Sequence, residues 1–360
     1  MVMDLRQAFA GLLTLSMFMM LGNMVKKDHF DSLDVNIPAT AVGQYGAVGV
    51  TGQSLATVSH LSKGHSQGLK PCWNPPALKE AEQSKGFVIF SLTNGPEYHL
   101  SQVADAVVVA RYLGATLVLP DIRSSKPGYK MNFGDIYDVN KFINSLGGFV
   151  RVTKAQPPQV SHGKVALVKV PNRPSERYIL TKIQPIFKSM GVLKIESYFP
   201  SINVTMEEEK KNLDSLACQA MFGSLQLQPE LQEVADSMIH KLRTWSQNLN
   251  GEFVAVDLRT EESVMPPAKK GKFLNSESSE IEKAIDFYIC SHSDVIVASV
   301  PGLWYDNVFG VRIGFGKTQI LVPDEIKSTS ASPFDYISPY VSQRTHFAYS
   351  CFCEFHEPHA

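Results

Sequence analysis

The first regular part of the chain contains two short apolar runs that flank a helical pattern. Residues 86–92 read GFVIFSL and residues 115–122 read ATLVLPDI. Between them, residues 97–114 place apolar side chains near one face and end at Gly114, as a helix does. Two buried strands joined by a helix form a parallel crossover unit, so this segment predicts an α/β fold.

The same alternation of strands and helices continues through the rest of the chain. Helical patterns occupy residues 135–148, 178–187, 228–247, 278–293 and 303–312, and short apolar runs occupy residues 165–170, 194–200, 251–259, 294–300 and 318–322. We therefore predict two Rossmann-like domains that face a cleft, a first half at residues 83–212 and a second half at residues 213–353, followed by a tail at 354–360. Ligands are expected where strands end and helices begin.

The N-terminus predicts a membrane anchor. Residues 8–25 contain eighteen residues without a charge, flanked by Arg6, Lys26 and Lys27. At about 1.5 Å per residue this segment approaches the ~30 Å core of a bilayer, and it offers no small-residue cleavage site of a signal peptide. The flanking charges alone would favour an outward N-terminus, whereas the folded mass behind the span argues that the body is translocated. Residues 1–7 are then a tail and residues 26–82, rich in Gly, Ser, Ala, Thr and His, a flexible stem.

Composition bounds the class of partner. The chain is 44% hydrophobic, with a mean hydropathy of −0.07 and a formal net charge of −1. It has no long basic stripe, so nucleic acid is not an expected partner. The run EEEKK at residues 207–211 is interpreted as a solvated loop.

Two features agree with a luminal body. The triplet NVT makes Asn203 a glycosylation acceptor. In an oxidising lumen the five cysteines, which are Cys72, Cys218, Cys290, Cys351 and Cys353, can form up to two disulfides with one thiol left over. The alternative is that Cys218 and Cys290 are packed thiols in apolar helices. The spacing of SCFC and its neighbouring histidines matches no standard zinc site.

The turn after the first strand is the first candidate site. The sequence TNGPEYH places Asn94, Gly95, Glu97 and His99 between a strand and a helix N-terminus. Backbone N–H groups and the helix dipole favour polar or anionic ligands there, and Gly95 allows close approach of a ligand to the backbone. The alternative is that Asn94 and Gly95 only form the turn and that Glu97 only favours the helix dipole.

Two further candidates lie in the second half. The strand FVAVDLR ends in Asp257 and Arg259, and an arginine at this point suits bidentate contact with a diphosphate. In SHSDVIVASVPG, Ser293 and Asp294 lie at a helix-to-strand junction, and Ser299 lies at the next strand-to-helix turn. A Ser–Gly turn at a helix start is a plausible phosphate cradle. The structural alternatives are ion pairs for Asp257 and Arg259, and a turn role for Asp294.

Long stretches of the chain resemble the plant O-fucosyltransferase-like family, and within it the mannan-synthesis-related branch. The resemblance runs over most of the chain and is most specific in four segments: FSLTNGPEYHLSQVADAVVVARYLGATLVLPDIR, ACQAMFGSLQLQPELQEVADSMIHKLR, EFVAVDLR and SESSEIEKAIDFYICSHSDVIVASVPGL. It implies a GT-B fold and a single-pass type II protein of the Golgi membrane. It also implies a GDP-sugar donor that binds without a metal or other cofactor.

The family's motifs carry over to particular residues. The turn Asn-Gly-Gly-Leu-Asn-Gln matches here at Asn94 and Gly95, whereas Pro96 replaces the second glycine and the Asn-Gln pair becomes Tyr98 and His99. In the family's His-Leu-Arg motif Arg259 matches and Asp257 replaces the histidine, which implies that Arg259 stabilises the donor diphosphate. Asp294 matches the aspartate of the family's third motif, so the resemblance implies a donor contact.

The chain departs from the family after Arg259. In similar proteins a long segment with a further strand and helix separates that arginine from MPPAKKGKF, whereas here only TEESV intervenes. The second half is therefore expected to be incomplete, with three strands.

Two functions follow from this reading. The first is transfer of a sugar, expected to be fucose, from a GDP-sugar to a hydroxyl of a polysaccharide or glycoprotein, with Arg259 on the diphosphate and Glu97 or His99 as general base. The second is a non-catalytic accessory protein that supports a mannan synthase, or an inactive shortened form.

Overall fold

The computed structural model describes residues 69–75, 77–78, 83–124, 128–158, 160, 164–199, 215–257, 279–298, 302–322 and 337–354. Within these ranges no helix combines the length and the hydropathy that crossing a bilayer requires. The anchor predicted at residues 8–25 and the predicted glycosylation site Asn203 lie outside the described residues.

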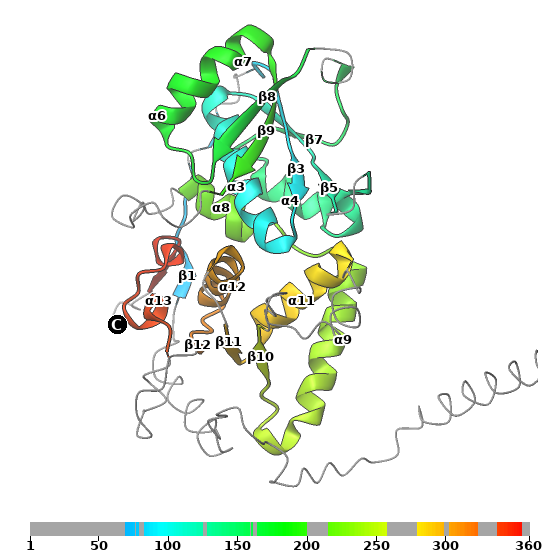
Figure 1. The fold of residues 1–360 in the computed structure, drawn as a ribbon, viewed down its shortest axis with the longest axis vertical. Helices are drawn as coiled ribbons and strands as arrows, with labels where there is room; N and C mark the ends of the chain where they lie inside the picture. Colours follow the sequence, from blue (N-terminus) through cyan, green and yellow to red (C-terminus); the bar gives the residue numbers. More distant parts are fainter. Residues whose placement is uncertain are drawn as a thin grey trace, which may run out of the picture. The chain divides into compact units, whose positions relative to one another are not determined.

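The strands and helices alternate along the described chain, as the sequence predicts (Figure 1). The strands are β1 (Leu69–Pro71), β2 (Phe87–Ile89), β3 (Ser91–Thr93), β4 (Thr116–Val118), β5 (Asp121–Arg123), β6 (Lys130–Asn132), β7 (Val152–Thr153), β8 (Ala166–Pro171), β9 (Val192–Tyr198), β10 (Val254–Val256), β11 (Val295–Val297), β12 (Ile320–Leu321) and β13 (Phe352–Glu354). The α-helices are α3 (Pro96–Leu113), α4 (Val139–Leu146), α6 (Glu176–Tyr178), α7 (Gln184–Met190), α8 (Ser215–Gly223), α9 (Pro229–Trp245), α11 (Glu280–His292), α12 (Leu303–Gly314) and α13 (Pro339–Ser342). Short 3₁₀ segments are η1 (Phe133–Asp135), η3 (Gln247–Leu249) and η5 (Phe347–Ser350), and the π-helix η2 (Ile179–Ile183) joins α6 to α7.

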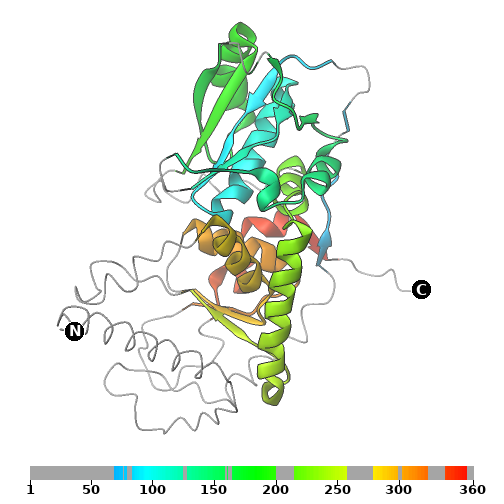
Figure 2. The ribbon, with the colours of Figure 1, turned by 90° about the vertical axis from the view of Figure 1, so that its right-hand side faces the viewer.

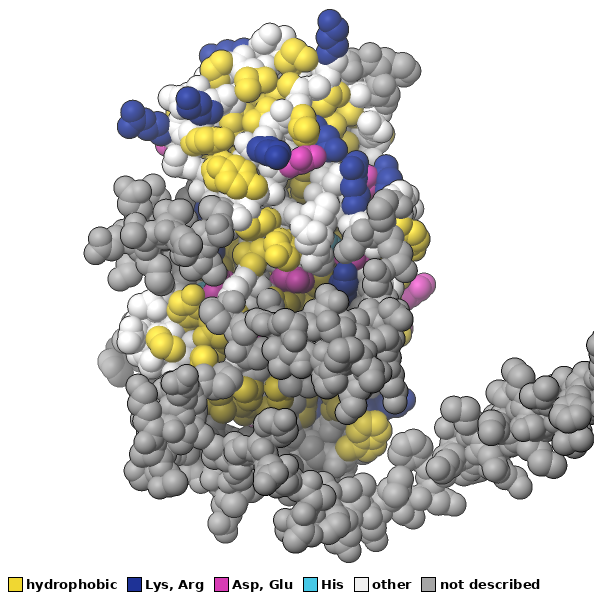
Figure 3. Space-filling model, in the orientation of Figure 1, with side chains coloured by type: hydrophobic (Ala, Val, Ile, Leu, Met, Phe, Trp, Pro, Cys, Tyr) yellow, Lys and Arg dark blue, Asp and Glu magenta, His cyan; other side chains and the backbone are white. Residues whose placement is uncertain are grey.

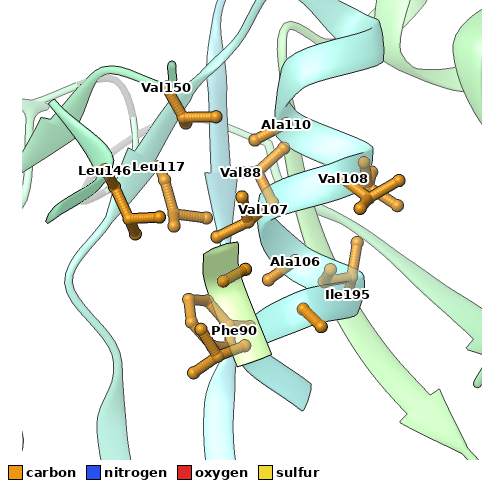
Figure 4. Packing of buried hydrophobic residues seen from close by; sticks show 14 of the residues in the cluster. Val88, Phe90, Ala106, Val107, Val108, Ala110, Leu117, Leu146, Val150 and Ile195 are labelled. Carbon is orange, nitrogen blue, oxygen red and sulfur yellow. The ribbon is translucent and has the colours of Figure 1, made fainter. Parts of the chain in front are cut away.

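The first half is built on a five-stranded parallel sheet with the order β7-β4-β2-β9-β8. Helix α3 packs against this sheet, and Figure 4 shows Val107 of α3 beside Val88 of β2 and Leu117 of β4. These three side chains are fully buried. The apolar run at residues 106–110 of the helix is therefore explained by burial on nearly all sides.

Two predicted strands each divide in two. The run at residues 86–92 breaks at Phe90 into β2 and β3, and the run at 115–122 breaks at Leu119 and Pro120 into β4 and β5. Proline has no N–H to donate to a ladder, which accounts for the second break. The outer pieces β3 and β5 leave the large sheet and pair with each other, and with β6 they form a separate three-stranded sheet.

The second half contains a three-stranded parallel sheet with the order β10-β11-β12 among the described strands. Ile296 of β11 and Ile320 of β12 are fully buried with Val308 and Phe309 of α12. Helices α9 and α11 lie side by side in both ribbon views (Figure 2). The α/β class is thus confirmed, and each of the three strands predicted for this half is present among the described residues.

One edge of this second sheet is open within the described residues. β10 pairs with β11 alone, and its Val254 and Val256 are 41% and 51% exposed. Trp245, at the end of α9, is 76% exposed. Other exposed hydrophobic side chains gather on the face of the molecule that Figure 3 shows. An open edge with apolar side chains is what the shortened second half predicts.

Two disulfides fasten the C-terminal end of the described chain. Cys72 bonds to Cys353 and Cys218 bonds to Cys351, and Cys290 is the remaining thiol. The prediction of two disulfides and one thiol is confirmed, so the alternative of a packed thiol holds for Cys290 and is wrong for Cys218. β1 pairs antiparallel with β13, so Leu69–Pro71 is folded chain, contrary to its assignment to a flexible stem.

The two predicted halves share one hydrophobic cluster. Ala217 and Met221 of α8 and Ala284 of α11 belong to the cluster that contains Val88 of the first sheet. Helix α8 lies against α3, although the sequence assigned it to the second half. The described residues therefore belong to one compact unit, in which the larger cluster crosses the predicted boundary at residue 212 and the second sheet keeps a smaller cluster of its own.

Candidate functional site

The turn before α3 has an unusual backbone. Asn94 has φ 68° and Gly95 has φ 103°, both in the left-handed region. A Cβ built on Gly95 would lie 2.7 Å from Oε2 of Glu97, so the carboxylate of Glu97 folds back over this glycine. The side-chain amide of Gln102 fixes the preceding strand end, because its oxygen accepts from the N–H of Thr93 and its nitrogen donates to the hydroxyl of Thr93. Only glycine fits the position at residue 95 without strain.

Glu97 lies in the first turn of α3 and is half-buried. Its carboxylate is at the positive end of the helix dipole, which stabilises the charged form. This position agrees with the alternative that Glu97 only favours the helix dipole. It also places a carboxylate at the strand-to-helix junction, where a ligand is expected.

His99 is in the core. Its side chain is 1% exposed, and its Nδ1 lies 2.7 Å from the hydroxyl of Tyr137. Burial, with a smaller contribution from Lys283, lowers the pKa of His99 to about 3. The imidazole is therefore neutral and weakly basic at any physiological pH, and the contacts favour a structural role for His99 over that of a general base.

Asn307 of α12 joins the second half to this turn. Its side chain is fully buried, and its Nδ2 donates to the carbonyl oxygen of Glu97 and to the hydroxyl of Ser101. The amino-terminal part of α12 is thereby held against the first turns of α3.

The carboxyl edge of the second sheet lies at the same end of α12. Asp257 follows β10, and its N–H donates to the carbonyl oxygen of Val297 in β11. Helix α12 begins at Leu303, and Gly302 at its N-cap makes no side-chain cap. The first turn of α12 therefore presents backbone N–H groups at the edge where Asp257 lies. Arg259 and Ser299, which the sequence assigns to this edge, lie outside the described residues.

Ser293 and Asp294 lie at the opposite, amino edge of this sheet, because they precede β11. The carboxylate of Asp294 faces Arg243 at 3.3 Å and Lys317 at 3.4 Å, and it accepts from the N–H of Phe253 at 3.0 Å. Ser293 is fully buried, and its hydroxyl donates to the carbonyl of Cys290. These contacts favour a structural role for both residues, with ion pairs at Asp294 in place of the turn role that the sequence suggested.

Arg312 organises this amino edge. It is fully buried, and its two terminal nitrogens donate to four backbone carbonyls, those of Cys290, Ser293, Asp294 and Gln319, and to the hydroxyl of Ser293. Desolvation lowers its pKa to about 10, so the guanidinium remains charged. Arg312 thus adds a donor to carbonyls at the end of α11 and at the strand ends, three of which also accept from another group.

A second buried polar cluster lies near His99. Glu280 at the start of α11 is 2% exposed, and it pairs with Lys283 at 2.9 Å. Burial, followed by the charges of Glu97 and Glu280, raises the pKa of Tyr137. Within the described residues no group of three or more His, Cys, Asp or Glu side chains is arranged to hold a metal ion, and the metal-free donor site stays an expectation.

Several polar residues at these junctions were not predicted. Asn307 follows Asp306 in helix α12, and no local pattern marks it as buried. Asn172 and Arg173 follow β8 in the sequence VPNRPSER, and the strand-end rule that selected Asn94 and Asp257 would also have selected them. Asp105, a single acid in the apolar run of α3, was a visible signal that was not used.

Comparison with known proteins gives the family. Residues 99–266 match the model of GDP-fucose protein O-fucosyltransferase. The chain is 51% identical over 419 aligned positions to Protein MANNAN SYNTHESIS-RELATED of Trigonella foenum-graecum, covering 98% of this chain and 99% of that protein. Protein MANNAN SYNTHESIS-RELATED 1 of Arabidopsis thaliana is 44% identical, with 97% and 99% covered.

Likeness to solved structures is weaker. The crystal structure of POFUT1 in complex with GDP has a TM-score of 0.35 and 16% identity, and it covers 66% of this chain and 98% of that chain. A likeness of this size carries no argument about the fold or the ligand of this chain.

The alignment with the relative from Trigonella also measures what this chain lacks. It has 419 positions, whereas 98% of 360 residues is about 353, so about 66 positions of the alignment face gaps in this chain. The position of the missing segment, after Arg259, stays a prediction. The near-complete coverage and the identity of 51% show that the chain belongs to the plant O-fucosyltransferase-like family, in its mannan-synthesis-related branch.

Proposed function

We propose that the chain is a glycosyltransferase that uses a GDP-sugar, expected to be GDP-fucose, and acts on a glycan or glycoprotein hydroxyl in mannan or cell-wall polysaccharide synthesis. The family description names GDP-fucose as the donor of its members, and the names of the closely similar relatives supply the link to mannan. The proposal includes the Golgi membrane as the location and residues 8–25 as the anchor.

One observation carries this proposal. The buried amide of Asn307 holds the amino-terminal part of α12 to the carbonyl of Glu97, so the carboxyl edge of the second sheet and the turn of the first half meet. A donor diphosphate at the start of α12 would be close to an acceptor hydroxyl at Glu97, as transfer requires.

The chemistry is a single displacement. The acceptor oxygen forms a bond to the anomeric carbon while the bond to the diphosphate breaks, and inversion follows. In our proposal Arg259 stabilises the charge on the departing GDP, and Glu97 takes the proton of the acceptor hydroxyl. Because His99 is buried with a low pKa, we assign the base to Glu97 alone.

Titration calorimetry of GDP and GDP-fucose into the full-length chain tests the donor site. We expect saturable binding that Arg259→Ala removes and that Arg243→Ala retains, since Arg243 pairs with Asp294 at the other edge of the sheet. Asp294→Asn separates the two readings of that residue. Lower stability with unchanged GDP affinity would mean a structural role, and lost GDP binding by folded protein would restore the donor contact. A Glu97→Gln protein with full turnover would end the base assignment.

The second candidate is a non-catalytic accessory protein that supports a mannan synthase. The gap of about 66 aligned positions and the burial of His99 favour it. Absence of GDP binding by a cooperatively folded sample would decide for this candidate.

A further inference from the structure

A second cavity lies on α3, away from the turn at Gly95. Its volume is about 360 Å³, and its walls are α3, α8 and the loop of residues 172–175 that joins β8 to α6. This loop is at the carboxyl end of a parallel strand, where α/β sheets bind ligands. The volume suits a small polar ligand.

The floor of the cavity contains a buried acid. Asp105 is 2% exposed, and its carboxyl oxygens accept from the N–H of Arg173 at 2.8 Å and from the hydroxyl of Ser197 at 2.7 Å. A carboxyl group in the middle of an apolar helix costs free energy to bury, so its retention needs a reason beyond packing.

The loop contributes an amide without a partner. Oδ1 of Asn172 is buried, and it makes no hydrogen bond to any residue that the structure describes. The next residue, Arg173, has φ 56°, a left-handed conformation that a non-glycine residue rarely adopts. The N–H of Arg173 donates to Asp105 in this conformation, and this bond fixes the loop that lines the cavity. An unsatisfied acceptor at a cavity wall fits a ligand that donates a hydrogen bond.

The cavity lining mixes basic and acidic groups. Arg173 and Arg177 line it together with the carboxyl groups of Asp105 and Glu176. Carboxyl, amide and guanidinium groups together both donate and accept, as the neighbouring hydroxyls of a sugar do. Tyr112 adds an aromatic ring to the wall, which suits the apolar C–H face of a sugar ring.

We propose that this cavity binds one sugar residue of a neutral polysaccharide, with Asn172 accepting a hydrogen bond from a sugar hydroxyl. Glu97 and Asp105 are eight residues apart on the same side of α3, about 12 Å along the helix axis. The bond between Asn307 and Ser101 lies between them. The cavity is therefore an anchoring subsite at a distance from the reaction site. This cavity proposal rests on the proposed function only in its choice of a polysaccharide as the ligand.

The test measures oligosaccharide binding by the full-length chain. We expect calorimetry to give saturable binding of mannohexaose, of cellohexaose, or of both. Asn172→Leu should weaken it about tenfold, the effect of one lost hydrogen bond of about 1.4 kcal/mol. Asn144→Leu, at an exposed position of α4, is the matched control and should leave the affinity unchanged. GDP affinity should be the same in all three proteins.

Hydrogen exchange on the unmutated chain gives an independent readout should Asn172→Leu not fold. Mannohexaose or cellohexaose should protect residues 101–112 and 172–178. Binding to neither hexasaccharide, equal affinity in Asn172→Leu, or competition by inorganic phosphate would overturn the proposal. Loss of GDP binding alone would count against the transferase function and leave the cavity proposal standing. Loss of oligosaccharide binding alone would count against the cavity proposal and leave the transferase function standing.

Discussion

Replacement of Asp105 by asparagine should change how the stability of the protein depends on pH. Burial raises the pKa of Asp105 to about 7 from its model-peptide value of 3.8, although hydrogen bonds from Ser197 and Arg173 oppose the rise. The protonated carboxyl can donate to Ser197 and accept from the N–H of Arg173. Asparagine can make the same two bonds with its amide, so Asp105→Asn imitates the protonated state without titrating.

The size and sign of the effect follow from the two pKa values. Between pH 4 and pH 7 the folded state keeps a proton on Asp105 that the unfolded state has lost, so stability falls as pH rises. At 1.36 kcal/mol for each pKa unit, a difference of about three units gives at most about 4 kcal/mol. Stability from this proton is fully present below pH 4 and is lost above pH 7.

Urea unfolding of both proteins at several pH values isolates this contribution. The free energy of unfolding of the natural chain minus that of Asp105→Asn should fall by up to about 4 kcal/mol from pH 4 to pH 8. Asp306, whose pKa burial raises to about 6, is common to both proteins and cancels in the difference. In a Ser197→Ala background the fall should move to higher pH, because the bond from Ser197 lowers the pKa of Asp105. A difference that stays flat over this range would mean that Asp105 is ionised throughout.

Three further predictions concern stability and solubility. Arg312→Met should lower the free energy of unfolding by about 1–3 kcal/mol, because the carbonyl of Asp294 loses the donor that Arg312 supplies while three other carbonyls keep a second donor, and urea unfolding against the exposed Arg177→Met would show it. Cys351→Ser opens the link to Cys218, which spans 133 residues, and should cost at most about 5 kcal/mol by the loop-entropy relation; an unchanged melting temperature would contradict this. Val256→Lys should reduce self-association in sedimentation at equal stability, because Val256 is 51% exposed on an open strand edge.

The sequence predicts the elements of this fold well and their partners less well. The crossover at residues 86–122 and the three strands of the second half follow from apolar periodicity, which local residues determine. The pairing of Leu69–Pro71 with β13 does not follow, because it depends on a disulfide between residues 281 apart. The placement of α8 against α3 also cannot be predicted from the sequence. An apolar helix between two domains can pack on either core, and the surfaces of the folded chain determine which one it covers.

Among the site residues, too, those that local sequence patterns place are predicted better than those that depend on distant contacts. Strand ends can be read from the sequence, so Asn94, Glu97 and Asp257 were placed at the correct edges. Asp294 was also placed correctly, at a helix-to-strand junction, but this junction is at the amino edge of the sheet, where Arg243 and Lys317 pair with it; its donor contact stays a prediction. A rule that counts only the carboxyl ends of parallel strands would have set Asp294 aside and added Asn172.

Buried polar side chains are the part that sequence reasoning reaches last. Asn307 and Asp105 each interrupt an apolar helical pattern, and a single polar residue in such a pattern is compatible with an exposed position or with a buried hydrogen bond. Which of these holds is decided by residues far away in the chain, Glu97 for Asn307 and Arg173 for Asp105. Because burying an unpaired polar group costs free energy, a distant hydrogen-bond partner favours such a buried position, as it does for both residues. A buried polar residue in an apolar helix is therefore a marker of a tertiary junction, and in this chain both junctions lie at a proposed binding site.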